Sequence, residues 1–351
     1  MCNRHLQHLM SNCLIIHAEG DKLTRGEIDR GQLAPDEIEV DVHFCGVCHS
    51  DIHQGKNDWG RAFFPIVPGH EVTGIVKSIG EAVTKFKVGD RVGVGVFKDS
   101  CGECEMCDQG KENYCLNGRT QTYNAPLPNG ERTKGGYAHT IHARESFSHH
   151  IPENLPLDAA APLLCAGITT YAPLKKWGVG PGKKVAVVGI GGLGHMAVKF
   201  ASALGAEVSV IGRDDSKKQD AMDFGAKEFL VTDEQFEQRI NHFDLVLNSA
   251  SANLGVDKFL KILKPEGVLV MLGLPTERPD FDPFNVVYAG RIIAGSNVAP
   301  MALTEEMLNF ASEKNILSEI EICSADEINQ AWERVEKSDV RYRFVLDAKT
   351  I

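Results

Sequence analysis

Four cysteines within one short stretch of the sequence have the spacing of a metal site. They follow the pattern Cys-x2-Cys-x2-Cys-x7-Cys and are Cys101, Cys104, Cys107 and Cys115. Four thiolates complete the tetrahedral coordination of zinc and leave no position for water, so such a site stabilises a loop. Two disulfides, free thiols or an iron–sulfur cluster are the alternatives. We favour structural zinc, because disulfides are rare in the reducing compartment that the rest of the chain indicates.

Two segments upstream contain residue types that suit a catalytic metal. Residues 45–53 read CGVCHSDIH and residues 68–71 read PGHE. A catalytic zinc takes three protein ligands and keeps one position open, and a cysteine and a histidine from these segments supply two of the three. Spacing does not identify the third ligand. Cys165, in the run LLCAG, is a candidate, and a buried free cysteine is the alternative explanation for it.

A glycine-rich turn predicts a dinucleotide site. Residues 189–194 read GIGGLG, follow the apolar run 184–188 and precede a helical pattern. In a strand–turn–helix context these glycines permit a tight turn and close approach of a pyrophosphate to the helix N-terminus. The residues expected to contact the cofactor here are Gly189, Gly191, Gly192, Leu193 and Gly194.

The residues after the next strand decide between NAD and NADP. The strand ends at Gly212, which cannot repel a phosphate, and Arg213 and Lys217 are suited to hold a 2′-phosphate. The rival interpretation is that Asp214 or Asp215 binds the ribose hydroxyls of NAD, because both lie near the required spacing.

The elements that must position these residues form two groups. Residues 1–155 are rich in β-branched runs separated by Gly and Pro, which predicts a mostly antiparallel β domain. Residues 156–296 alternate strands with helices, which predicts a doubly wound parallel sheet of the Rossmann type. Residues 297–351 are expected to return to the first domain. The predicted strands are 37–44, 71–79, 91–96, 184–188, 207–211, 244–248, 267–272, 291–295 and 342–346, and the predicted helices are 158–166, 193–204, 216–224, 254–263 and 324–337.

Composition limits the classes of function. The chain has 351 residues, a length that suits two domains. A net charge of −11 makes nucleic acid a poor partner. No apolar run is long enough for a membrane span, and the N-terminus lacks the pattern of a signal peptide, so a cytoplasmic location is expected.

The motifs together resemble the medium-chain dehydrogenase/reductase superfamily, and within it the cinnamyl alcohol dehydrogenase branch. The matching segments read CHSDIH at 48–53, GHE at 69–71, LCAGIT at 164–169 and GIGGLG at 189–194, together with the four clustered cysteines. The resemblance implies an α/β Rossmann domain, a GroES-like catalytic domain and an active site in the cleft between them.

The resemblance also implies roles for residues. The catalytic zinc ligands are then Cys48 (not Cys45), His70 and Cys165. Glu71 binds the metal when water or substrate leaves, and Asp51 steadies the ligand histidine. Ser50 and His53 relay a proton between the reacting oxygen and solvent, and Thr169 belongs to the cofactor site.

The implied function is a zinc-dependent oxidoreductase that interconverts primary alcohols and aldehydes, mainly reducing aromatic or aliphatic aldehydes with NADPH. Two zinc ions per chain and a homodimer through strand 291–295 are expected. A polyol dehydrogenase is a rival, although polyol enzymes often have glutamate where Cys165 stands, and a non-catalytic zinc- and NADP-binding protein is another. Trp59 and the segment 116–136 are candidates for the substrate pocket. The leading residues 1–10 and four cysteines have no assigned role, namely Cys2, Cys13, Cys45 and Cys323.

Overall fold

The computed structural model describes residues 9–275 and 277–351, which form two compact units. The first unit comprises Met1–Cys165 and Ala299–Ile351, and the second is Ala166–Val298. The expectations for Cys2 and for the start of the chain lie outside the described residues. Across the described ranges, no helix has the length and apolar character needed to cross a bilayer.

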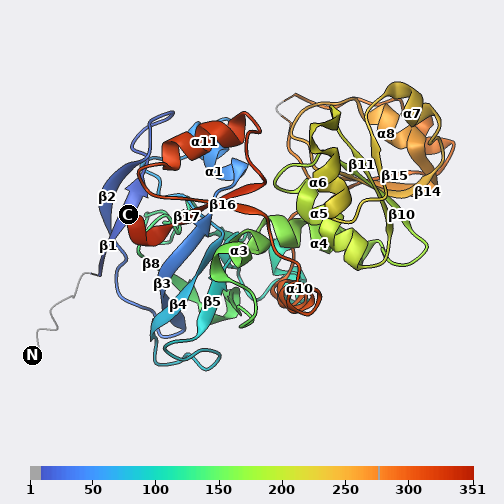
Figure 1. Ribbon diagram of the computed structural model, residues 1–351. Coiled ribbons are helices and arrows are strands. Elements are labelled where there is room, and N and C mark those ends of the chain that lie inside the picture. The colour runs from blue at the N-terminus through green and yellow to red at the C-terminus, as the bar shows by residue number, and fades with distance from the viewer. Residues whose placement is uncertain (1–8, 276) are drawn as a thin grey trace, which may run out of the picture. The chain divides into compact units, whose positions relative to one another are not determined.

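A seven-stranded sheet forms the first unit. Its order is β16-β17-β3-β4-β5-β9, with β8 also paired to β3, and every pair except β16–β17 is antiparallel. Figure 1 shows the blue strand β3 beside the red strand β17, so the two chain segments of this unit share one sheet. The strands are β3 (Glu37–Gly46), β4 (Val72–Ile79), β5 (Arg91–Val94), β8 (Thr140–Arg144), β9 (Ser148–His150), β16 (Ile320–Cys323) and β17 (Arg343–Asp347).

Alternating side chains explain why this sheet has one core face. Ile38, Val40 and Val42 of β3 are fully buried, whereas the intervening side chains lie on the other face. Two small ribbons complete the strands of the unit. They are β1 (Met10–Ile15) with β2 (Thr24–Asp29), and β6 (Phe97–Asp99) with β7 (Thr120–Gln121).

Short helices connect the strands of the first unit. They are α1 (His49–Gly55), α2 (Glu105–Asp108), α3 (Leu157–Ala160), α10 (Met301–Lys314) and α11 (Ile328–Glu336), with single 3-10 turns η1 (Glu112–Tyr114), η2 (Glu145–Phe147), η3 (Ala161–Leu164) and η5 (Ala348–Thr350). The helix predicted from Ser324 begins only at Ile328. The Glu327 carboxylate accepts hydrogen bonds from the amide and hydroxyl of Ser324, and these bonds close a turn ahead of the helix.

The second unit is a six-stranded parallel sheet with the order β12-β11-β10-β13-β14-β15. The chain starts at the centre, moves outward to β12 and returns to β13 beside β10. Such a sheet binds ligands at the point where the strand order reverses, outside the carboxyl ends of the strands. The strands are β10 (Lys184–Val188), β11 (Glu207–Ile211), β12 (Glu228–Leu230), β13 (Phe243–Asn248), β14 (Leu263–Met271) and β15 (Ile292–Gly295).

The helices of the second unit alternate with its strands. They are α4 (Ala166–Lys176), α5 (Gly194–Ala203), α6 (Lys218–Asp223, after the turn η4 at Asp215–Lys217), α7 (Asp233–Glu237), α8 (Val256–Ile262) and α9 (Phe284–Val287). The predicted fold class, a Rossmann-type parallel sheet with a mostly β second part, is confirmed.

The junction near residue 160 differs from the sequence-based expectation. The predicted helix 158–166 is broken into α3 and η3, and Cys165 leaves helical geometry with φ −127° and ψ −69°. α4 then covers Ala166–Lys176, of which only Ala166 was predicted to be helical. The Thr73 hydroxyl donates to the carbonyl of Leu157, and η3 packs on β3 and β5, so residues 156–165 belong with the sheet of the first unit.

Candidate metal centres and cofactor loop

Four buried side chains of the first unit converge on one point. They are Cys48, His70, Glu71 and Cys165, and one donor atom from each lies within 4.8 Å of the others. Cys48 precedes helix α1, His70 and Glu71 precede strand β4, and Cys165 stands at the break after η3. Two thiols, an imidazole and a carboxyl group are the donors that zinc prefers, so this set fits a zinc ion.

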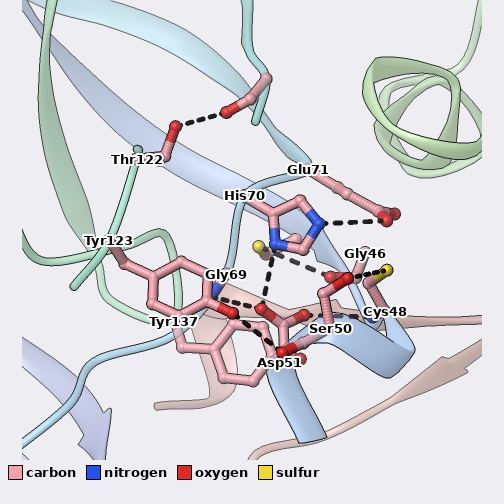
Figure 2. Close-up of polar contacts among 12 residues, drawn as sticks. Gly46, Cys48, Ser50, Asp51, Gly69, His70, Glu71, Thr122, Tyr123 and Tyr137 are labelled. Atoms are coloured by element: carbon pink, nitrogen blue, oxygen red, sulfur yellow. Dashed lines mark hydrogen bonds and ion pairs between the residues drawn. The ribbon is translucent and has the colours of Figure 1, made fainter. Parts of the chain in front are cut away.

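The Asp51 carboxylate joins the two loops that supply the first donors. One oxygen accepts from His70 Nδ1 at 3.0 Å and from the Gly69 amide at 3.2 Å, and the other accepts from the Cys48 amide at 3.1 Å. Figure 2 shows this carboxylate between the His70 ring and the start of α1. Asp51 is fully buried, so its position is fixed by these three bonds.

These contacts also determine which nitrogen of His70 faces the other donors. Because Nδ1 donates to Asp51, Nε2 points toward the cluster. Burial alone lowers the pKa of His70, but the charge and hydrogen bond of Asp51 outweigh burial and hold that pKa well above its ordinary value. The negative charge of Asp51 would stabilise a metal cation bound to Nε2 in the same way as it stabilises a proton there.

Glu71 is a buried carboxylate with one partnered oxygen. Oε1 forms an ion pair with the Arg343 guanidinium from β17, and it lies 3.9 Å from His70 Nε2. Within the described chain, Oε2 has no hydrogen-bond partner. Burial raises the pKa of Glu71 to about 7, against the opposing effect of Arg343. A buried carboxylate oxygen without a hydrogen-bond partner lowers the stability of the folded chain, and a cation bound nearby would supply the missing interaction.

Gly46 explains how Glu71 fits so closely beside β3. The Gly46 amide donates to the Glu71 carbonyl at 3.0 Å. A Cβ atom at residue 46 would lie 1.9 Å from Glu71 Oε2, so any side chain there displaces the carboxylate. Glycine is therefore required at this position.

The two thiols of the cluster shift each other's pKa. The hydrogen bond from Cys165 lowers the pKa of Cys48 well below its usual value, and the same bond together with burial raises the pKa of Cys165. Zinc binds thiolates, so its binding is coupled to the loss of thiol protons.

Ser50 and Tyr123 contact the metal donors, and His53 lies on the same helix as Ser50. The Cys48 thiol lies 3.6 Å from the Ser50 hydroxyl oxygen, and His53, one turn later on α1, pairs through Nδ1 with Asp58 at 2.7 Å. The Tyr123 ring stacks on the His70 ring, with centroids 5.8 Å apart and ring planes at 26°, and its hydroxyl donates to the Ser50 carbonyl at 3.2 Å. Both predicted relay residues thus lie on one short helix, with Ser50 beside the Cys48 thiol.

The second cluster contains the four closely spaced cysteines. Four of the six sulfur–sulfur distances are 3.5 to 4.0 Å, all four sulfurs lie within 4.8 Å of one another, and all four thiols are free. Four sulfurs at about 2.3 Å from one tetrahedral ion lie about 3.8 Å apart, whereas disulfide sulfurs lie about 2.05 Å apart. The amides of Cys107 and Leu116 lower the pKa of Cys104 to about 6, which favours the thiolate. The geometry fits a single metal ion and excludes disulfides among these four residues.

The glycine-rich loop lies at the end of β10, where the strand order reverses. Gly189 has φ +81°, in the left-handed region, and a Cβ at Gly194 would lie 2.0 Å from the Gly189 carbonyl oxygen. A Cβ at Gly191 meets nothing within 4 Å, so packing within the protein does not require glycine there. Open space at Gly191 and an N-terminus of α5 without a side-chain cap suit a bound pyrophosphate.

The end of β11 has no room for an acidic side chain. A Cβ at Gly212 would lie 2.4 Å from the Phe229 ring. Asp214 accepts the Ser216 amide at 2.9 Å, so its carboxylate caps the following turn. Lys217 reaches back to the Ile190 carbonyl of the glycine loop at 3.4 Å, while Arg213 is exposed. Of the two basic residues, Lys217 therefore contacts the glycine loop. Thr169 is half-buried on α4.

Comparisons with known proteins identify the family of this chain. Residues 34–153 match the alcohol dehydrogenase GroES-like domain, and residues 192–313 match the zinc-binding dehydrogenase domain. The chain is 49% identical to NADP-dependent alcohol dehydrogenase C 1 of Mycolicibacterium smegmatis, over 94% of this chain and 96% of the relative. The chain belongs to the medium-chain dehydrogenases of the cinnamyl alcohol dehydrogenase branch.

Solved structures of two relatives superpose on this dehydrogenase over almost their whole length. A cinnamyl alcohol dehydrogenase from Sorghum bicolor has a TM-score of 0.94 and 40% identity, covering 97% of this chain and 98% of the relative. The structure titled CAD from Helicobacter pylori, complexed with NADP(H), has a TM-score of 0.93 and 36% identity, covering 98% and 99%. This dehydrogenase therefore has the alcohol dehydrogenase fold and is an alcohol or aldehyde oxidoreductase of the zinc type.

Two residues of this dehydrogenase's metal site have no counterpart in the sequence-based analysis. Arg343 pairs with Glu71 across 272 positions of sequence, and Tyr123 packs on His70 from the segment that was assigned only to the pocket mouth. No helix or strand periodicity in the neighbouring sequence indicates either contact. An arginine at the start of an otherwise buried strand was the only available indication of the first.

Proposed function

We propose that this dehydrogenase reduces aldehydes to primary alcohols with NADPH, using one zinc at Cys48, His70 and Cys165 and a second at the four clustered cysteines. The main support is the buried cluster of two thiols, an imidazole and a carboxyl group, in which Glu71 retains an unpartnered oxygen. Three ligands and a fourth group that can leave are what an open catalytic site requires.

The residues around the cluster have separate roles in proton transfer and in positioning the metal ligands. When bound, zinc polarises the carbonyl oxygen as a Lewis acid and NADPH supplies the hydride. Ser50, whose hydroxyl lies beside the Cys48 thiol, donates the proton that the reduced oxygen needs. His53 restores that proton from solvent, because its partner Asp58 holds it at the exposed end of the group. Asp51 holds His70 in place throughout.

The preference for NADPH follows from the end of β11. NAD-dependent enzymes place an acid there for the ribose hydroxyls, and Gly212 cannot be replaced by one without moving Phe229. Arg213 and Lys217 are the proposed partners of the 2′-phosphate. NADP in the names of the relatives from M. smegmatis and H. pylori supports the same choice.

Two rival functions are less well supported. Polyol dehydrogenases often place a glutamate where Cys165 stands, and here a thiol occupies the third donor position. A non-catalytic protein would have no use for Ser50 and His53 beside the donors.

A reducing, cytoplasmic environment agrees with the four free thiols of the second cluster.

A homodimer is part of the proposal. β15 forms an edge of the parallel sheet, with Ile292 and Ile293 exposed, and Val287 and Tyr288 before it are 71% and 81% exposed. Large apolar side chains along a free strand edge favour pairing with a second copy. Sedimentation should give a dimer mass, and Ile293→Lys should give a monomer; a monomeric wild-type chain would refute this part.

The test of the whole proposal is an initial-rate assay with benzaldehyde and cinnamaldehyde, with NADPH or NADH, on protein whose zinc content is measured in parallel. We expect rapid NADPH oxidation, a strong preference over NADH and about two zinc ions per chain. Oxidation of ribitol or sorbitol in preference to aldehyde reduction would favour the polyol rival. Two bound zinc ions without turnover of any substrate would favour the non-catalytic one.

A further inference from the structure

The hairpin 124–133 begins directly after Tyr123, which packs on His70. Its backbone is held by bonds from the Asn124 amide to the Thr133 carbonyl at 2.8 Å and from the Leu127 amide to the Glu131 carbonyl at 2.9 Å. Asn124 has φ +60°, a left-handed conformation that asparagine and glycine adopt more readily than other residues. It is only 9% exposed, so its side chain points into the unit.

The Asn124 amide bridges helix α1 and the far end of the loop that follows this helix. Its Nδ2 donates to Gln54 Oε1 at 2.9 Å, and its Oδ1 accepts from the Phe63 backbone amide at 3.3 Å. Gln54 follows His53 on α1. Because the Phe63 amide can only donate, it fixes which end of the Asn124 side chain faces the loop.

That loop, residues 57–63, carries two aromatic side chains, and we call it the aromatic loop. The Trp59 ring lies 5.0 Å from the His53 ring, and Phe63 is 53% exposed. The Arg132 guanidinium from the hairpin lies 3.6 Å from the centroid of the Phe63 ring and also donates to the Asn124 carbonyl. The aromatic loop therefore lies beside the proposed relay histidine and is fastened to the hairpin at its far end.

The internal shape of the aromatic loop does not depend on Asn124. Asn57 Oδ1 accepts the Ala62 amide at 3.0 Å, and the Gly60 amide donates to the Asn57 carbonyl at 2.8 Å. These bonds close the loop on itself. The start of the loop is also tied to α1, because the Asn57 amide donates to the Gln54 carbonyl at 3.1 Å and the Asp58 amide donates to the His53 carbonyl at 3.0 Å. What Asn124 adds is a connection between α1 and the far end of the loop, at Phe63.

We infer that Asn124 is a positioning residue that sets the place of the aromatic loop beside α1, and that the loop in turn selects larger aldehydes. The inference rests on the proposed aldehyde reduction. An aldehyde whose carbonyl lies near Ser50 contacts Trp59 or Phe63 only if it carries a bulky group, so a displaced loop penalises bulky substrates selectively. A small aldehyde is reduced without these contacts.

The test uses Asn124→Gly, which removes both side-chain bonds and keeps a residue suited to the left-handed backbone. Asn315→Gly is the matched control, because Asn315 also has a left-handed backbone (φ +51°) and lies exposed after α10 in the same unit. We expect kcat/KM for cinnamaldehyde to fall about tenfold in Asn124→Gly, the effect of losing one or two neutral hydrogen bonds, and kcat/KM for propanal to change less than about twofold. Zinc content is measured alongside and should not change.

Tryptic cleavage after Arg61 gives a second measurement that needs no activity. Arg61 is exposed within the aromatic loop, so a loosened loop should be cut faster in Asn124→Gly than in wild type or Asn315→Gly. The inference would be overturned if kcat/KM fell equally for cinnamaldehyde and propanal. It would also be overturned if both the rate of tryptic cleavage and the cinnamaldehyde kinetics were unchanged. Faster cleavage in a protein that reduces no aldehyde would support the positioning role of Asn124 and refute the proposed function instead.

Discussion

Replacing Asp51 by asparagine is the most direct test of how the catalytic metal site is held. The substitution keeps the shape of the side chain but removes its charge and turns one oxygen into an N–H donor. If the remaining oxygen keeps its hydrogen bonds from His70 and Gly69, the new NH2 group faces the Cys48 N–H, which donates to the carboxylate in the wild type. Two donors then face each other. One charge-assisted bond is lost, worth about 1.5–3 kcal/mol. The other two become neutral and weaker.

Substitutions of residues that support metal ligands usually lower metal affinity about 10–100-fold, which is about 1.4–2.7 kcal/mol and agrees with the loss of one such bond. The assay is zinc content after dialysis against a graded series of chelator concentrations. The zinc content of Asp51→Asn should fall from about two ions per chain to about one, at a chelator concentration at which the wild type keeps both ions.

Asp29→Asn is the control for this experiment, because Asp29 also accepts a backbone amide, that of Gly31, but lies outside the site. It should keep both zinc ions. If Asp51→Asn binds zinc within about twofold of the wild type, the argument that this carboxylate supports the metal site is wrong.

Three further predictions concern other parts of the chain. Cys107→Ser should release the structural metal and lower the melting temperature while the catalytic zinc stays bound, as zinc analysis and calorimetry would show; an unchanged melting temperature would contradict the structural role. Arg213→Ala should raise the Kd for NADPH about tenfold or more and leave that for NADH nearly unchanged, whereas Lys218→Ala should affect neither, and equal weakening of both cofactors would refute a phosphate contact. Glu305→Gln should lower the free energy of unfolding at pH 7 by up to about 1 kcal/mol, because the half-exposed carboxylate pairs with His149 and Lys85. These partners lower the pKa of Glu305 to about 2, so its contribution is present above about pH 4.5 and disappears as pH falls toward 2; urea titrations at pH 7 and pH 3 should show the difference shrinking.

The parallel sheet was accessible from sequence because its strands are continuous apolar runs. β10 and β11 have the predicted limits of 184–188 and 207–211, since buried parallel strands are apolar on both faces and end at glycines. α4 was missed because it contains Gly167 and Pro173, which oppose helix formation. Most of its side chains are buried, so tertiary packing rather than local propensity stabilises that helix.

The metal sites show a similar division. The four cysteines of the structural cluster lie within 15 consecutive residues, so their spacing alone indicated their proximity. Cys165 lies far along the chain from His70, and only the resemblance to a family placed it in the cluster. The Glu71–Arg343 pair depends on β17 joining β3, a contact set by sheet topology that no local pattern encodes.

The sharing of one sheet by β3 and β17 has a consequence for biosynthesis. The second unit is continuous in sequence and is fully synthesised before residue 299, whereas the first unit lacks β17 until residues 343–347 have been added. Until then Glu71 has no guanidinium partner, and its carboxylate cannot be buried without cost. A nascent chain, or one truncated before Arg343, keeps every proposed metal ligand and still cannot complete the pocket that holds them. The maturation of the catalytic centre is thus tied to the synthesis of β17.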